Sequence, residues 1–225
     1  MVAGSHDVLS LSRDVLEDLD VFEIRADMFN SGPGELVSSV TGTLNRCREL
    51  GKATLLTIRS VAEGGHCRLS DTERLDLYLK LLEHCDGIDI EVEAGGKLWH
   101  VLCDACKDAG KLLVGSFHDF EKTPPDSEIE KMFAKSRELG GDLFKVACAA
   151  GEPDDVARIL AFTSRHRMEG VIALSMGPLG LISRVAAPVL GSLLTYGYVS
   201  ASSAPGQLSC VELVRYLKVF CPLVG

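Results

Sequence analysis

A lysine inside an apolar, strand-like segment is the residue of this chain best suited to covalent chemistry. Lys145 lies within residues 142–149, which otherwise have the pattern of a buried β-strand. Burial of an ammonium group costs free energy, so we expect the pKa of Lys145 to be lowered. An amine of lowered pKa is a nucleophile that forms a Schiff base with a ketone. Taken alone, such a lysine more often reaches out to solvent or completes a buried ion pair.

Other titratable side chains fall on the same faces of neighbouring strand-like segments. Side chains alternate between the two faces of a strand, so apolar Phe22 and Ile24 oppose a polar face. The polar set comprises Glu23, Arg25, Asp27, Arg59, Asp89, Glu91, His118 and Lys145. If the apolar faces lie under helices, all eight groups point inward together. Burying so many charged groups together costs too much free energy for a purely structural role, so the set predicts an active site.

The residue types in this set indicate a specific chemistry. His118 can act as a general acid and base near neutral pH, and Glu63 is a candidate to set its tautomer. Arg184 offers a planar guanidinium for a substrate carboxylate. With Lys145, these groups predict Schiff-base chemistry on a ketone that bears a carboxylate. From the residues alone, a class I aldolase and a dehydratase both remain open.

The elements that must position these groups alternate regularly between strand and helix patterns. Strands are expected at residues 1–3, 21–25, 54–59, 87–91, 112–117, 143–147, 171–175 and 193–198. Helices are expected at residues 8–19, 35–50, 71–84, 98–109, 127–139, 154–166, 180–190 and 210–220. Eight such units predict an α/β fold, a (β/α)₈ TIM barrel forming one domain over residues 1–225, with active-site groups at the carboxyl ends of its strands. A doubly wound open sheet is the structural alternative.

Composition narrows the classes of function. The 225 residues carry a net charge of −9, which argues against a nucleic-acid groove. Residues 185–211 carry no charge, but prolines, glycines and serines interrupt them, so we expect no membrane span there. No secretion signal is visible and eight cysteines are present, which predicts thiols in a reducing cytoplasm. Cys103 and Cys106 have redox or metal spacing, but on a helix they are expected to be buried structural thiols.

These residues and their spacing resemble the type I 3-dehydroquinate dehydratases of the shikimate pathway. The resembling segments are residues 22–27, 57–65, 116–124, 144–147, 175–177, 180–184, 191–197 and 203–207. The chain begins later than longer members of that family, so we expect the N-terminal hairpin that caps their barrel floor to be absent. Tyr196 stands where many members have phenylalanine, which adds a hydroxyl near the pocket.

The resemblance implies a syn dehydration of 3-dehydroquinate to 3-dehydroshikimate without metal or organic cofactor. It implies that Lys145 forms the imine, His118 moves the protons and Glu63 positions His118. The implied substrate-binding residues are Glu23, Arg25, Arg59, Arg184, Ser203, Gln207, Met176 and Tyr196, with Ser203 and Gln207 on a closing loop. It also implies a homodimer. Two other readings are a Schiff-base aldolase on a similar barrel and a non-catalytic ligand-binding barrel; the second predicts loss of Lys145 or His118, and both are present.

Overall fold

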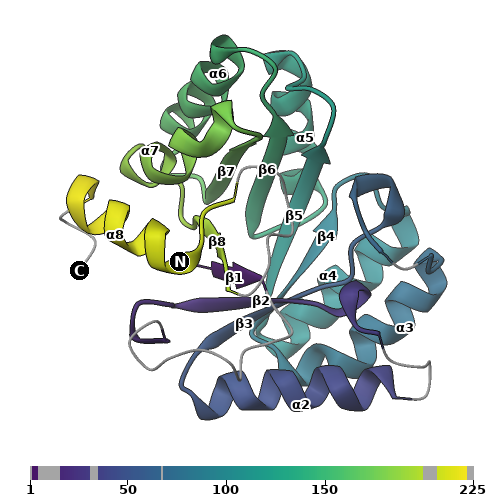
Figure 1. Cartoon of the computed structure of the whole chain (residues 1–225). Coiled ribbons are helices and arrows are strands. Elements are labelled where there is room, and N and C mark those ends of the chain that lie inside the picture. The colour runs from purple at the N-terminus through teal and green to yellow at the C-terminus, as the bar shows by residue number, and fades with distance from the viewer. Residues whose placement is uncertain (1, 5–15, 31–34, 67, 200–206, 222–225) are drawn as a thin grey trace.

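The computed structural model describes residues 2–4, 16–30, 35–66, 68–199 and 207–221, in which strands and helices alternate along the chain (Figure 1). The strands are β1 (Val2–Gly4), β2 (Val21–Arg25), β3 (Ala53–Thr57), β4 (Gly87–Glu91), β5 (Leu112–Asp119), β6 (Leu143–Ala149), β7 (Val171–Met176) and β8 (Tyr196–Tyr198). The α-helices are α2 (Leu36–Glu49), α3 (Asp71–Leu81), α4 (Gly96–Ala109), α5 (Asp126–Glu138), α6 (Pro153–Arg165), α7 (Ser183–Val189) and α8 (Cys210–Phe220). The 3₁₀ helices within these residues are η2 (Ala26–Met28), η3 (Val61–Glu63), η4 (Leu82–His84) and η5 (Leu179–Ile182).

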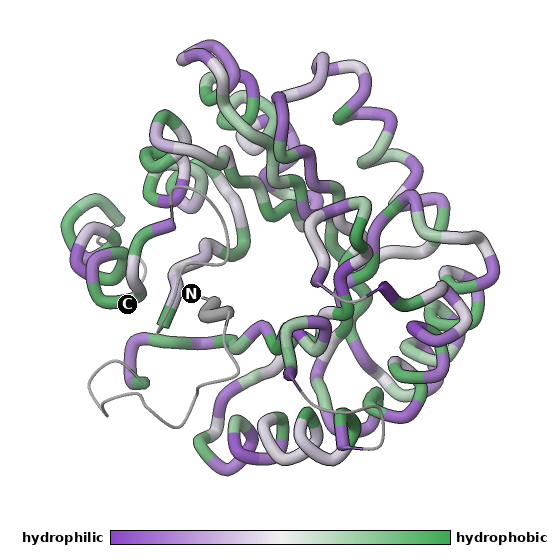
Figure 2. Tube along the Cα trace, turned by 45° about the vertical axis from the view of Figure 1, so that its right-hand side comes forward, coloured by the Kyte–Doolittle hydropathy of each residue, from purple (hydrophilic) through white to green (hydrophobic). Residues whose placement is uncertain are grey.

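The strands form one parallel sheet that curls into a barrel. Its order is β7-β6-β5-β4-β3-β2-β1-β8, so strands that follow one another in sequence pair from β1 through β7, and β1 also pairs with β8. The Leu193 amide donates to the Val171 carbonyl at 2.9 Å, which ties the segment before β8 to β7. Helices lie outside the ring of strands (Figures 1 and 2). The predicted (β/α)₈ barrel is confirmed, and the doubly wound alternative is wrong.

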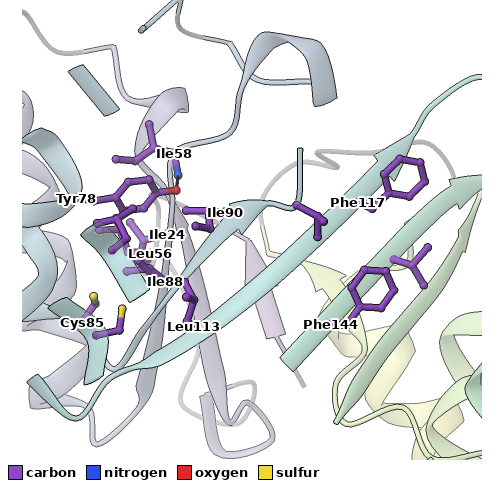
Figure 3. Packing of buried hydrophobic residues seen from close by; sticks show 14 of the residues in the cluster. Ile24, Leu56, Ile58, Tyr78, Cys85, Ile88, Ile90, Leu113, Phe117 and Phe144 are labelled. Atoms are coloured by element: carbon purple, nitrogen blue, oxygen red, sulfur yellow. Dashed lines mark hydrogen bonds between the residues drawn. The ribbon is translucent and has the colours of Figure 1, made fainter. Parts of the chain in front are cut away.

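Two apolar clusters follow from the alternation of side chains along each strand. The larger lies between the sheet and the helices, where Ile24, Leu56 and Ile88 are fully buried (Figure 3). The smaller cluster includes Leu55 and Ile172, which come from the opposite strand faces. The outward faces therefore bind the helices, and the inward faces are free to carry polar groups near the strand ends.

Strand β3 ends two residues before the predicted boundary. It was expected to extend through Arg59, but it stops at Thr57. The Tyr78 hydroxyl accepts a hydrogen bond from the Ile58 amide at 2.9 Å, and Arg74 donates to the Ile58 carbonyl at 3.0 Å. These side chains of α3 take the backbone groups that a longer strand would have used. The chain therefore leaves the sheet just before Arg59.

The last third of the barrel also differs from the expected boundaries. The single helix predicted over residues 180–190 is divided into η5 and α7, and the strand predicted over residues 193–198 is reduced to the three residues of β8. In the described part of the chain, no helix is long and apolar enough to cross a bilayer. Cys103 and Cys106 lie buried on α4, as expected. Most of the helix predicted over residues 8–19 falls outside the described residues.

Candidate active site

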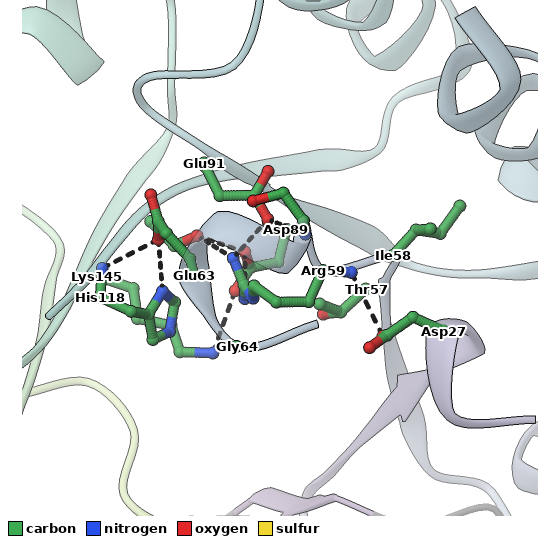
Figure 4. Close-up of polar contacts among 12 residues, drawn as sticks. Asp27, Thr57, Ile58, Arg59, Glu63, Gly64, Asp89, Glu91, His118 and Lys145 are labelled. Carbon is green, nitrogen blue, oxygen red and sulfur yellow. Dashed lines mark hydrogen bonds and ion pairs between the residues drawn. The ribbon is translucent and has the colours of Figure 1, made fainter. Parts of the chain in front are cut away.

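Lys145 projects from β6 into a buried ion-pair network at the barrel mouth (Figure 4). Its Nζ atom lies 3.0 Å from Asp89 Oδ2 and 3.2 Å from Glu23 Oε1, and the residue is 4% exposed. Burial alone would lower the pKa of Lys145, but the charges of Asp89 and Glu23 raise it above its ordinary value. The expectation that burial lowers this pKa is therefore wrong. The two acids outweigh the effect of burial because they contact the amine directly.

His118 and Glu63 form a hydrogen-bonded pair beside this network. His118, near the end of β5, places Nδ1 2.8 Å from Glu63 Oε2, and its backbone amide donates to the same oxygen at 2.9 Å. Burial lowers the pKa of His118 well below its ordinary value, and Arg59 and Lys145 act in the same direction. Burial raises the pKa of Glu63 to about 8, against the opposing charge of Arg59. The two groups therefore titrate as a coupled pair.

A tight glycine turn brings Glu63 to the histidine. Glu63 ends η3, and Gly64 follows in the left-handed region at φ 83°. The Gly65 amide donates to the Ser60 carbonyl at 2.8 Å, and a Cβ atom on Gly65 would lie 2.0 Å from the Arg59 carbonyl oxygen. Only glycine fits this close approach of backbone to backbone. The turn thus fixes the position of the carboxylate relative to β5.

Arg59 links the carboxylates at the centre of the network. Its guanidinium donates to Asp89 at 2.8 Å, to Glu91 at 3.2 Å and to Ser116 at 2.6 Å. These acids raise the pKa of Arg59 despite its complete burial, so the residue stays charged. The carboxylates and the guanidinium neutralise one another, which allows the whole set to remain desolvated.

Side chains outside the barrel hold this centre in place. Arg74 of α3 pairs with Glu91 on the side opposite Arg59 and also bonds Asp71 at 3.2 Å. The Trp99 indole donates to the Glu91 carbonyl at 2.8 Å, and the Tyr78 hydroxyl donates to the Asp89 carbonyl at 2.6 Å. The central carboxylates are therefore fixed both by their backbone and by their side chains.

Two arginines at the rim are held in different ways. Arg25 makes two hydrogen bonds to Asp27, at 2.8 and 2.7 Å, which fix its guanidinium plane. Arg184 of α7 donates to the Tyr196 carbonyl at 3.0 Å and is 2% exposed. Burial lowers the pKa of Arg184 to about 10, which leaves it a cation at neutral pH. A buried cation at the cavity wall is suited to receive an anionic group.

The cavity at the barrel mouth gathers most of the predicted site residues. It is lined by Glu23, Arg25, Arg59, Glu63, His118, Phe120, Lys145, Ala147, Leu174, Met176, Arg184, Tyr196 and Gln207. Asp27 and Glu91 do not line it; Asp27 forms an ion pair with Arg25, and Glu91 forms one with Arg59. Ser203 lies outside the described residues.

Sequence reasoning missed two of the residues that shape the site. Phe120 lines the cavity two residues beyond His118, and the two rings stack with centroids 6.5 Å apart. Arg74 falls on the buried stripe of α3 with Leu77, Tyr78 and Leu81. A charged residue on an otherwise apolar helix face was the available signal, because such a residue needs a buried partner.

The arrangement combines three chemical capabilities in one cavity. It has an amine for addition to a carbonyl, a histidine–carboxylate pair for proton transfer, and a buried guanidinium for an anion. Within the described residues, no group of three or more His, Cys, Asp and Glu side chains is arranged to hold a metal ion.

Known proteins resemble this chain over nearly its whole length. A model of the type I 3-dehydroquinase family matches residues 4–221. The 3-dehydroquinate dehydratase of Thermodesulfovibrio yellowstonii is 33% identical over 219 residues, which covers 97% of this chain and 93% of the relative. The crystal structure of 3-dehydroquinate dehydratase from Aquifex aeolicus VF5 superposes with a TM-score of 0.83 at 33% identity, covering 97% of each chain. The type I enzyme of Clostridium difficile, solved with covalent modified comenic acid, gives a TM-score of 0.81 at 30% identity over 94% of this chain and 87% of that one.

Proposed function

The chain belongs to the type I 3-dehydroquinase family, and on that premise we propose that it converts 3-dehydroquinate to 3-dehydroshikimate through a Schiff base on Lys145. It is a hydro-lyase of the shikimate pathway. The relative crystallised with a covalently modified acid supports a covalent mechanism. We assign the whole chain, residues 1–225, to one catalytic domain that uses no metal or organic cofactor.

Lys145 provides the nucleophile in this proposal. The resting amine is an ammonium ion held by Asp89 and Glu23, so it must lose a proton before it attacks the ketone. Glu23 Oε1, 3.2 Å away, is placed to accept that proton. The iminium that follows is a cation at the same position and keeps the attraction of both carboxylates. The network that disfavours the free amine therefore favours the iminium, which draws electrons from the adjacent C–H bond.

His118 moves the protons of the elimination. With its Nδ1–H directed at Glu63, the Nε2 atom is free to take the proton next to the iminium carbon. The same histidine then protonates the departing hydroxyl, which gives a syn elimination because one base serves both positions. Glu63 is a positioning residue that fixes the tautomer of His118.

The remaining lining residues bind the substrate. Arg184 receives the carboxylate, and the family resemblance assigns Ser203 and the cavity-lining Gln207 to substrate binding beside it. Glu23, Arg25 and Arg59 hold the ring hydroxyls and order the network. Met176 and Tyr196 cover an apolar face of the substrate ring; both are almost completely buried at the cavity wall.

The observation that carries the proposal is the juxtaposition of Lys145 and the His118–Glu63 pair in one cavity that Arg184 also lines. Enone formation from 3-dehydroquinate, followed by ultraviolet absorbance, tests it. The wild type should turn over substrate, and Lys145→Ala and His118→Ala should each lose nearly all activity while remaining folded by circular dichroism. Full turnover by Lys145→Ala would remove the basis of the proposal.

We also propose that the enzyme is a cytoplasmic homodimer. An apolar groove of about 660 Å³ lies between α7 and α8, lined by Val185, Val189, Tyr216 and Phe220 among others. Val189 and Phe220 are 60% and 62% exposed. Exposed apolar surface of this extent favours association, and a second copy of the chain is the occupant that the family resemblance supports. The biosynthetic role of the family supports the cytoplasmic location.

A further inference from the structure

The Tyr196 hydroxyl is a buried polar group at the reaction centre. Tyr196 is 4% exposed, and the described residues provide no acceptor for the proton of its hydroxyl. Two other side chains, Ser136 and Ser175, share this property, but neither lines the active-site cavity. Leaving a buried hydroxyl unpaired costs free energy, and native structures contain few such groups. The hydroxyl of Tyr196 is the one that lies where a substrate would supply a partner.

Contacts at both ends hold Tyr196 next to the groups that bind and attack the substrate. Lys145 Nζ lies over its ring, 4.5 Å from the centroid, in a cation–π contact. Its backbone carbonyl accepts the hydrogen bond from Arg184 Nη1, and the neighbouring Thr195 hydroxyl donates to the Arg184 carbonyl at 2.7 Å. The tyrosine therefore lies between the amine and the guanidinium, and β8 fixes its backbone.

We propose that the Tyr196 hydroxyl donates a hydrogen bond to the oxygen of the carbonyl group that Lys145 attacks. This assignment rests on the Schiff-base function proposed above. In that step a C–N bond forms and the C–O bond breaks, and the two protons lost from the ammonium leave with the oxygen as water. The oxygen passes through a tetrahedral carbinolamine in which it carries more negative charge than in the ketone. A fixed hydroxyl donor stabilises that charge without giving up its own proton.

The environment of Tyr196 suits a donor of this kind. Burial raises the pKa of its hydroxyl, and the positive charge of Lys145 offsets only part of this rise. The phenol therefore stays protonated throughout the working pH range. It is a catalytic residue in this assignment because it touches the reacting oxygen.

Tyr196→Phe removes only the hydroxyl and separates this role from a structural one. We expect the rate at which Lys145 becomes trapped by borohydride in the presence of 3-dehydroquinate to fall at least about tenfold, as for loss of a donor to a developing charge. The free variant should melt at the same temperature as the wild type or higher, because the buried hydroxyl that is removed has no acceptor for its proton among the described residues. Tyr198→Phe, two residues along the same strand, is the matched control and should trap at the wild-type rate.

The outcomes distinguish this inference from the function on which it rests. Trapping of Tyr196→Phe at the wild-type rate would overturn the role of the hydroxyl and leave the Schiff base intact. A lower melting temperature with unchanged trapping would assign the hydroxyl to the fold alone. Absence of any adduct on Lys145 in the wild type would instead contradict the proposed function itself.

Discussion

Lys145 Nζ lies 3.0 Å from Asp89 Oδ2, while the other oxygen of Asp89 accepts hydrogen bonds from Arg59 at 2.8 Å and Ser116 at 2.6 Å. One carboxylate thus holds the amine and the guanidinium at a fixed separation in the barrel mouth. This contact explains why the pKa of Lys145 is raised although the residue is buried. It also implies that the enzyme stabilises the iminium rather than the free amine.

Replacement of Asp89 should lower both the free energy of unfolding and the pKa of the Lys145 amine. Asp89→Asn leaves Lys145 and Arg59 short of a buried counter-charge, so we expect a loss of about 3–5 kcal/mol in the free energy of unfolding. The pKa of Lys145 should fall, which pH-dependent labelling of the amine measures. Urea denaturation measures the free energy of unfolding. The control is Asp76→Asn, which breaks an exposed ion pair with Lys80 and should lower the free energy of unfolding by at most about 1 kcal/mol.

The difference in the free energy of unfolding between the wild type and Asp89→Asn should decrease at acid pH. Although burial opposes it, the cations Arg59 and Lys145 lower the pKa of Asp89 below its ordinary value of 3.8. A lowered folded-state pKa stabilises the protein above the unfolded-state value, and this contribution is lost as the pH falls through the folded-state value. The advantage of the wild type should therefore be complete at neutral pH and shrink only below pH 3.8. A difference that is already lost at pH 6 would contradict this assignment.

Replacement of Glu63 should move the pH profile of the reaction. In its working form the base His118 is neutral, with its Nδ1–H directed at an ionised Glu63 and its Nε2 unprotonated. This form appears when the His118–Glu63 pair, which shares one additional proton at lower pH, loses that proton. In Glu63→Gln, His118 titrates without a carboxylate partner, and burial and Arg59 lower its pKa. The acid limb of kcat/KM should move to lower pH by at least about one unit, while kcat falls about 10–100-fold. A limb that stays in place or moves to higher pH would argue against the coupled pair.

Replacement of Arg184 should weaken substrate binding. Lysine keeps the charge but loses the planar pair of donors for a carboxylate. We expect Arg184→Lys to raise KM about tenfold or more, with a smaller effect on kcat. Arg165→Lys, which changes an exposed arginine of α6, is the control and should leave both constants unchanged. A change confined to kcat would place the substrate carboxylate elsewhere.

A charge in the α7–α8 groove should separate the proposed dimer. Val189→Glu places a carboxylate on an exposed apolar face, and a symmetric interface would bring two copies together. Light scattering should give the mass of a dimer for the wild type and of a monomer for the variant. Leu79→Glu adds the same charge to an exposed position of α3 and should remain dimeric. A monomeric wild type would overturn the proposal.

The barrel and its inward polar groups could be predicted because they depend on local periodicity. Alternation along β2 separates Phe22 and Ile24 from Glu23, and the same rule directs Lys145 inward. Strand ends were harder to predict, because Tyr78 and Arg74 take the backbone groups of Ile58 from a different element. Such long-range hydrogen bonds leave no local signal.

The pKa of Lys145 could not be predicted for a related reason. The sequence shows which charges point inward but not which of them touch. Asp89 contacts the amine, while Arg59 contacts the acids instead. The sign of the pKa shift depends on that pairing, because contact distance decides which charge dominates.

Reductive trapping tests the central claim, that Lys145 forms an imine with 3-dehydroquinate, most directly. Borohydride should reduce the iminium to a stable secondary amine, and peptide mass mapping should locate one substrate-derived adduct on Lys145. Lys145→Ala should acquire none under the same conditions. An active wild type that carries no adduct on Lys145, or an adduct on a different lysine, would contradict the mechanism.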